Sequence, residues 1–314
     1  MGNSIILKTH TLFIFLLSFV PGISQEINYE IKEISINAYV DGTLLNPTST
    51  EKPVLAIIIA GSGPTDRNGN QNFLKSNNLK KLAESLTKQG IATFRYDKRI
   101  VKQIKTGHID KNIMFDDFVT DAISVIGYFK KTNAYSKIYI IGHSQGSLVG
   151  MLAAKDKTDG FISLSGAGQS IDSVIIEQVQ KTAPMYTEDT KRVFSVMHEG
   201  KTTHDYPPAL SSIFNIEIQP FMMNWMQYHP YDIIKTLDMP ILIINGTKDL
   251  QVSVEEAKTL KEASEHAVLK IIDKMNHVLF IIEGDDLENT KSYNESSRMI
   301  SEEMVSAIID FIKL

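Results

Sequence analysis

A serine between two glycines is the residue of this sequence best placed to do chemistry. Gly142, Ser144 and Gly146 form a G-x-S-x-G pentapeptide. The apolar residues 138–141 predict a buried strand before it, and the small residues of 147–155 predict a helix after it. A strand, a sharp turn and a helix with this pentapeptide at the corner form a nucleophile elbow, which exposes the serine hydroxyl. We expect both glycines to be required, because side chains there would collide with the neighbouring strand and helix.

The base that would activate Ser144 must be sought among the histidines. The same pentapeptide also occurs in ordinary tight turns with an inert serine, so its partners decide between the two interpretations. A serine hydroxyl is a weak nucleophile at neutral pH and needs a general base, which in turn needs an orienting acid. With a nucleophile elbow, the order along the chain is serine, acid, histidine. His277 alone among the later histidines follows the last predicted strand, 266–272, and we predict it as the base.

The orienting acid is predicted from its place after a strand. Asp249 ends the loop that follows the apolar run 240–244, at the carboxyl end of that predicted strand. Asp273 and Glu255 are weaker candidates for the same role. We therefore predict a catalytic triad of Ser144, Asp249 and His277.

Two backbone N–H groups are predicted to stabilise the oxyanion of a tetrahedral intermediate. One is that of Gln145, directly after the nucleophile. The other belongs to the loop after the apolar run 53–60, where we choose Ser62 and keep Gly63 as the alternative, since Pro64 has no N–H. A plain Gly-Pro turn is the competing interpretation of this loop. A phosphate-binding loop is excluded, because no G-K-[ST] follows.

Composition excludes several classes of protein. The 314 residues are 43% hydrophobic and 22% charged, with a net charge of −5, so nothing indicates a nucleic-acid partner. There is no cysteine. A thiol nucleophile, a disulfide and a cysteine-based metal site are therefore excluded.

The first 24 residues resemble a secretory signal peptide. Lys8 supplies the positive region, residues 11–20 form a short apolar stretch, and small residues precede Gln25. The apolar stretch is too short to span a membrane comfortably. We predict cleavage after Ser24, export to the periplasm or the medium, and no stable membrane insertion of the mature chain. The alternative is an uncleaved anchor.

The rest of the chain alternates between strands and helices, which favours a mostly parallel, doubly wound α/β sheet. Residues 41–42 are predicted as a turn. The predicted strands are 31–40, 53–60, 91–96, 137–141, 161–164, 240–244 and 266–272. The predicted helices are 79–89, 115–130, 147–155, 252–263 and 298–313.

One segment, 167–239, breaks the alternation. It has no apolar run typical of a buried strand but several amphipathic stretches, such as 171–179. We predict a helical cap insertion over the catalytic edge of the sheet, dividing a core of 25–166 and 240–314. Its methionines would form an adaptable apolar pocket or, as the favoured alternative for each one, fill the insertion's own core. With Trp225 they are Met185, Met197, Met222, Met223 and Met226.

The pentapeptide 142–146 together with Asp249 and His277 resembles the α/β-hydrolase superfamily. The segments 61–70 and 95–99 resemble those of the acyl esterases near serine aminopeptidases and dienelactone hydrolases. The resemblance covers nearly all of the mature chain, the insertion least. It implies the α/β-hydrolase fold with a helical cap, and a serine hydrolase that needs no metal or organic cofactor.

The segment after residue 99 departs from that family, because Ile100 stands where such proteins usually carry glycine. The resemblance further implies that Asp66, Arg67, Asp97 and Arg99 brace loops through ion pairs, with substrate binding by Arg67 as the lesser alternative.

The function expected from these residues is hydrolysis of a small-molecule carboxylic ester through an acyl-enzyme. A serine aminopeptidase-like amide hydrolase is the main alternative. A non-catalytic binding protein on the same fold is the competing class, and a missing triad residue would favour it.

Overall fold

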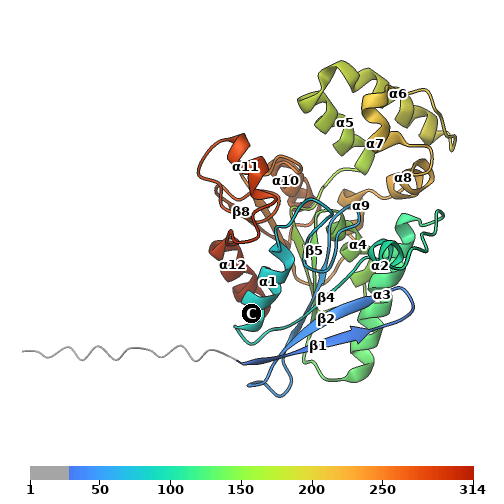
Figure 1. Cartoon of the computed structure of the whole chain (residues 1–314). Coiled ribbons are helices and arrows are strands. Elements are labelled where there is room, and N and C mark those ends of the chain that lie inside the picture. Colours follow the sequence, from blue (N-terminus) through green and yellow to red (C-terminus); the bar gives the residue numbers. More distant parts are fainter. Residues whose placement is uncertain (1–27) are drawn as a thin grey trace, which may run out of the picture.

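One sheet of eight strands forms the centre of the molecule (Figure 1). The computed structural model describes residues 28–314, so the predicted signal segment lies outside the described residues. The strand order is β1-β2-β4-β3-β5-β6-β7-β8; β2 pairs antiparallel with β1 and β4, and all the other pairs are parallel. The strands are β1 (Tyr29–Ser35), β2 (Asp41–Pro47), β3 (Leu55–Ile59), β4 (Ala92–Tyr96), β5 (Ile138–His143), β6 (Gly160–Leu164), β7 (Ile241–Gly246) and β8 (Val268–Ile272).

Helices cover both faces of this sheet, as the predicted doubly wound fold requires (Figure 1). Alternate residues of a strand point to opposite faces. Leu55, Ile57 and Ile59 of β3 therefore pack with α3 (Phe115–Thr132), α4 (Gln145–Ala154) and α10 (Val254–Ala263). Ala56 and Ile58 pack with α1 (Asn78–Thr87) and α12 (Glu302–Lys313). Burial on both faces explains the continuous apolar run of this strand.

The turn predicted at residues 41–42 is wrong. These residues begin β2, and the chain reverses earlier, where the Asn37 side chain accepts the N–H of Tyr39 and Val40. Gly42 is needed for packing, because a Cβ there would lie 2.2 Å from the Phe94 ring. Glycine, asparagine and proline are depleted in strands, so β2 carries little strand signal.

Two helices were not predicted, α2 (Arg99–Thr106) and α11 (Asp286–Ser292). Ile100, where the sequence departs from the family that it resembles, lies in the first turn of α2. Among the described residues, no helix has the length and apolarity needed to cross a membrane.

Between β6 and β7 the chain forms only helices, and all of them except the last project from one edge of the sheet (Figure 1). We call residues 171–234 the helical insertion; it has an apolar cluster of its own that includes Phe194 and Phe214. Met197, Met222 and Met226 are buried in this cluster, whereas Met185 is exposed. The helices are α5 (Ile171–Thr182), α6 (Thr187–His198), α7 (Ser211–Phe214), α8 (Gln219–Met226) and α9 (Pro230–Ile234), with short 3-10 turns at Pro184–Tyr186 and Pro208–Leu210.

Candidate active site

Ser144 lies in the sharp turn between β5 and α4, as the pentapeptide predicts. Its backbone has φ 54° and ψ −122°, a conformation that costs energy for a residue with a side chain. A Cβ on Gly142 would lie 2.3 Å from the Gly146 oxygen. One on Gly146 would lie 2.4 Å from the Ile59 oxygen of β3. Both glycines are thus needed for close packing of the turn against the helix and the neighbouring strand.

His277 and Asp249 form a buried hydrogen-bonded pair. The His277 Nδ1 donates to Asp249 Oδ2 at 2.8 Å and lies 3.1 Å from Oδ1. The Asp249 Oδ1 also accepts the backbone N–H of Gln251 and of Val252, each at 2.9 Å. Burial acts to raise the pKa of Asp249, but His277 and these N–H donors outweigh it and hold the pKa below its ordinary value. A carboxylate is therefore favoured at this position.

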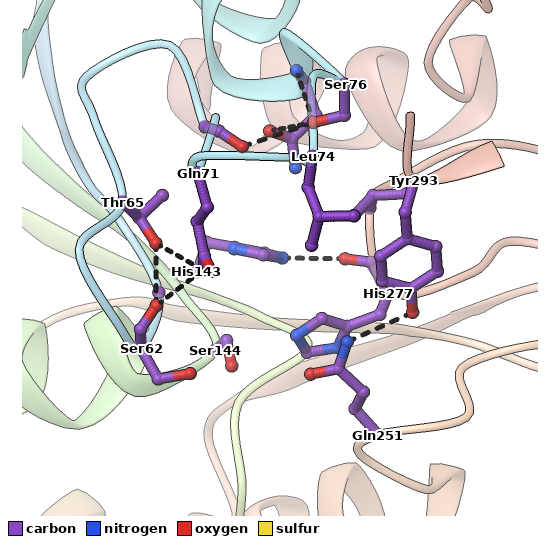
Figure 2. Close-up of a pocket in the computed structure, with 14 residues that line it drawn as sticks. Ser62, Thr65, Gln71, Leu74, Ser76, His143, Ser144, Gln251, His277 and Tyr293 are labelled. Carbon is purple, nitrogen blue, oxygen red and sulfur yellow. Dashed lines mark hydrogen bonds between the residues drawn. The ribbon is translucent and has the colours of Figure 1, made fainter. Parts of the chain in front are cut away.

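Ser144 and His277 line the same small pocket, of about 80 Å³ (Figure 2). The Nδ1–H of His277 faces Asp249, which leaves the other ring nitrogen as the acceptor for a proton. The weaker acid candidates have other partners: Asp273 accepts from Thr247 Oγ1, and Glu255 pairs with Lys258. Chain order and strand position thus selected a histidine that lines the same pocket as Ser144 and the carboxylate that is hydrogen-bonded to this histidine.

The loop after β3 passes close to Ser144. A Cβ on Gly61 would lie 3.2 Å from the Ser144 Cβ. The Ser62 carbonyl accepts from Thr65 Oγ1 at 2.7 Å and from Gln71 Nε2 at 3.0 Å, which fixes the loop (Figure 2). Within residues 28–314, no hydrogen bond occupies the Ser62 N–H. Such a free backbone donor beside a nucleophile is suited to bind an oxyanion.

His143, which precedes the nucleophile, contacts the base but was not identified from the sequence. Its Nε2 donates to the His277 carbonyl at 2.8 Å (Figure 2). Burial, and secondarily the neighbouring His277, lowers the pKa of His143 to about 4. The ring is therefore neutral at physiological pH and holds the segment that carries His277. The sequence has no signal for this role, because it depends on a contact between residues distant in the chain.

Ion pairs brace the loops around the site, as expected for three of the four residues predicted to do so. Arg67 pairs with Asp97 at 3.0 Å and with Glu33, and Arg99 pairs with Asp121 at 2.8 Å. Asp66 is the exception, since its carboxylate accepts backbone N–H groups of its own turn, those of Asn68 and Asn70.

A larger cavity, of about 430 Å³, lies between the serine and the helical insertion. Ser62, Ser144 and Gln145 line it on the side of the sheet. Mostly apolar side chains line it on the other side, among them Ile171, Val174, Ile175, Phe221, Met222 and Trp225. Met222 is thus the one insertion methionine that lines this cavity while also packing in the insertion's own core.

Comparison with known proteins finds a serine aminopeptidase family and an esterase. The family model described as serine aminopeptidase, S33, matches residues 74–208. Esterase EstD of Thermotoga maritima is 24% identical over 293 residues, which cover 90% of this chain and 68% of that protein. These matches confirm the resemblance to the α/β-hydrolase superfamily that the sequence predicts.

Solved structures show the same fold. Est1E from Butyrivibrio proteoclasticus superimposes with a TM-score of 0.57 at 18% identity, covering 90% of this chain and 99% of that one. The Pyrococcus furiosus esterase Pf2001 gives a TM-score of 0.55 at 16% identity, with 95% of each chain covered. These likenesses confirm the predicted fold class and leave the reaction to be inferred from the site.

Proposed function

We propose that this protein is a serine hydrolase that cleaves carboxylic esters through an acyl-enzyme. The observation that carries the proposal is the joint position of Ser144 and His277 in one pocket, with the His277 Nδ1 hydrogen-bonded to Asp249 at 2.8 Å. A nucleophile at an elbow, a base and an orienting acid are the groups that acyl transfer to water requires.

The proposed reaction has two half-reactions, and both use the same groups. His277 takes the Ser144 proton as the oxygen attacks the ester carbonyl, and returns it to the leaving alcohol. His277 then takes a proton from water as the water oxygen attacks the acyl-enzyme carbonyl. The bond to the Ser144 oxygen breaks, His277 returns the proton to that oxygen, and the acid is released. Asp249 keeps the ring oriented and stabilises the imidazolium. The N–H groups of Ser62 and Gln145 hold the oxyanion in both steps.

The substrate proposed is a small-molecule ester with an apolar group. The lining of the 430 Å³ cavity supports this, because apolar side chains there would bury an acyl chain beside the serine. EstD and Pf2001 are both described as esterases, which agrees with the choice of ester. We further propose that 167–239 acts as a cap and that residues 1–24 direct export.

An amide substrate is the second candidate. The observation that favours it is the match to the family model described as serine aminopeptidase. Both reactions would use the same triad, so the structure of the site alone does not separate them.

Replacing the nucleophile tests the proposal. We expect wild type to hydrolyse p-nitrophenyl butyrate and to react with a fluorophosphonate, and Ser144→Ala to lose both, with kcat falling on the order of 10⁶-fold. Ser136→Ala, at an exposed serine, is the matched control and should behave as wild type. Turnover of leucine p-nitroanilide without any ester turnover would favour the amide candidate. Folded wild type that resists labelling at Ser144 would refute the hydrolase.

A further inference from the structure

Lys98, between β4 and α2, has a buried side chain that ends beside the candidate oxyanion site. Only 6% of the residue is exposed. Its Nζ donates to the Gly61 carbonyl at 3.0 Å and to Gln145 Oε1 at 2.7 Å. The amine also lies 4.2 Å from the centre of the Phe118 ring. Both hydrogen-bond acceptors are neutral oxygens, which is unusual for a buried lysine.

The contact with Gly61 bears directly on Ser62. The Gly61 carbonyl and the Ser62 N–H belong to one peptide unit, and a trans peptide is planar with these groups pointing in opposite directions. The described chain contains no cis peptide bond. A donor fixed on the Gly61 oxygen therefore fixes the direction of the Ser62 N–H. It also polarises the peptide, which makes that N–H a better donor.

The same amine also contacts the side-chain oxygen of Gln145, the residue whose backbone N–H is the second proposed donor. Gln145 is the first residue of α4, and its backbone N–H is the other group expected to face the oxyanion. Lys98 thus connects the loop after β3 to the start of α4. Thr65 and Gln71 hold the Ser62 carbonyl, so the Ser62 residue is fixed through hydrogen bonds to both of its flanking peptide units.

We propose that Lys98 is a positioning residue of the oxyanion site, which orients the Gly61–Ser62 peptide and ties it to Gln145. The proposal rests on the proposed hydrolase function. In this role Lys98 acts through the backbone N–H groups of Ser62 and Gln145, and it lines a cavity of about 330 Å³ together with these two residues.

The energetic setting supports a role other than stability. Burial lowers the pKa of Lys98 to about 7. Taking an ammonium out of water without a carboxylate partner costs free energy that a well-packed apolar side chain would avoid. The amine donates hydrogen bonds whether or not it is protonated, so both contacts persist across neutral pH. A methionine of similar length is therefore the natural replacement.

Lys98→Met should lower kcat for p-nitrophenyl butyrate by about 10- to 100-fold with KM changed less than about twofold, since removal of a whole oxyanion donor costs about 10²–10³. The affinity for a trifluoromethyl ketone, which forms a tetrahedral adduct, should fall by the same factor as kcat/KM. Lys102→Met is the matched control, because it makes the same substitution at a lysine whose partner is Asp41, at 2.8 Å, and not Gly61 or Gln145. This variant should keep wild-type kinetics.

The outcomes separate this inference from the proposed function. Wild-type kcat in Lys98→Met would overturn the inference and leave ester hydrolysis intact. A loss of kcat with unchanged affinity for the ketone would also overturn it, because that pattern indicates general disorder of the site. Absence of turnover by wild type itself would overturn the hydrolase, and this inference with it. Where Lys98→Met does not fold, Gln145→Leu removes one contact and keeps the backbone N–H; wild-type kcat in that variant would count against the proposal.

Discussion

At the scale of single residues, the histidine before the nucleophile has the clearest measurable consequence. His143 donates from Nε2 to the carbonyl of His277, and the two rings lie 4.9 Å apart between centroids. Burial disfavours a positive charge on the His143 ring, and the neighbouring His277 disfavours it further. Protonation of His143 would therefore oppose the folded arrangement of the site.

Acidification should destabilise the protein through this residue. In the unfolded chain His143 binds a proton near its ordinary pKa of about 6.5, whereas in the folded chain its pKa is lowered to about 4. Between these values the unfolded state holds more protons, so the free energy of unfolding decreases as pH falls through that window. His143→Gln, which keeps a donor, should lose less stability. Urea midpoints at pH 7.5 and 5.0 test this, and equal losses for both proteins would contradict it.

How far the sequence predicts these residues depends on the kind of information each requires. Asp249 and His277 could be predicted because the order of strands places them at the carboxyl edge of the sheet. Lys98 and His143 could not. Their roles arise from contacts to backbone carbonyls of distant segments, and no spacing rule encodes such contacts.

At the scale of elements, the strands that are buried on both faces of the sheet were the ones that the sequence predicted most clearly. Strands β3, β5 and β7 are buried along their whole length and appear as continuous apolar runs. By contrast, α2 has only 8 residues and is mostly polar. Its apolar residues Ile100, Val101 and Ile104 do have helical spacing, but they span little more than one turn, which is too short a pattern to indicate a helix. The insertion was recognisable as helical because its amphipathic stretches pack on one another.

The turn at the nucleophile should tolerate no added carbon atom. Gly146→Ala places a Cβ 2.4 Å from the Ile59 oxygen, so we expect a loss of about 1–3 kcal/mol in the free energy of unfolding. Gly127→Ala is the matched control: nothing lies within 4 Å of its added Cβ. That change in the middle of α3 should stabilise by about 1 kcal/mol. Urea denaturation measures both, and a neutral Gly146→Ala would contradict the tight packing described.

At the scale of the whole molecule, the helical insertion and the sheet share one cavity. Its walls come from segments on both sides, so insertion residues would set which acyl groups fit while the sheet supplies the chemistry. This division explains why the sequence predicts the triad but not the substrate. The triad follows from fixed positions on strands, whereas the cavity depends on how the insertion packs.

Filling the cavity from the insertion should shorten the preferred acyl chain. Each buried methylene contributes about 0.8 kcal/mol, so losing room for two of them in Ile171→Trp should reduce the preference for octanoate over acetate about tenfold. The kcat/KM for p-nitrophenyl acetate should change little. Met185→Trp, at an exposed position of the insertion, is the control. An unchanged chain-length profile for Ile171→Trp, measured with p-nitrophenyl esters, would place the acyl group elsewhere.

The two outermost strands of the sheet bear on how the protein behaves when concentrated. A strand at the edge of a sheet exposes unpaired backbone N–H and C=O groups, to which a strand of another molecule can bind. Lysines on an edge strand discourage this binding. Lys32 on β1 pairs with Glu30, and Lys270 on β8 pairs with Glu303. Both margins thus carry hydrated charges where a strand from a second molecule would have to add. We therefore expect these charges to oppose the addition of a further strand at both edges of the central sheet, where Ile31 and Val268 are exposed.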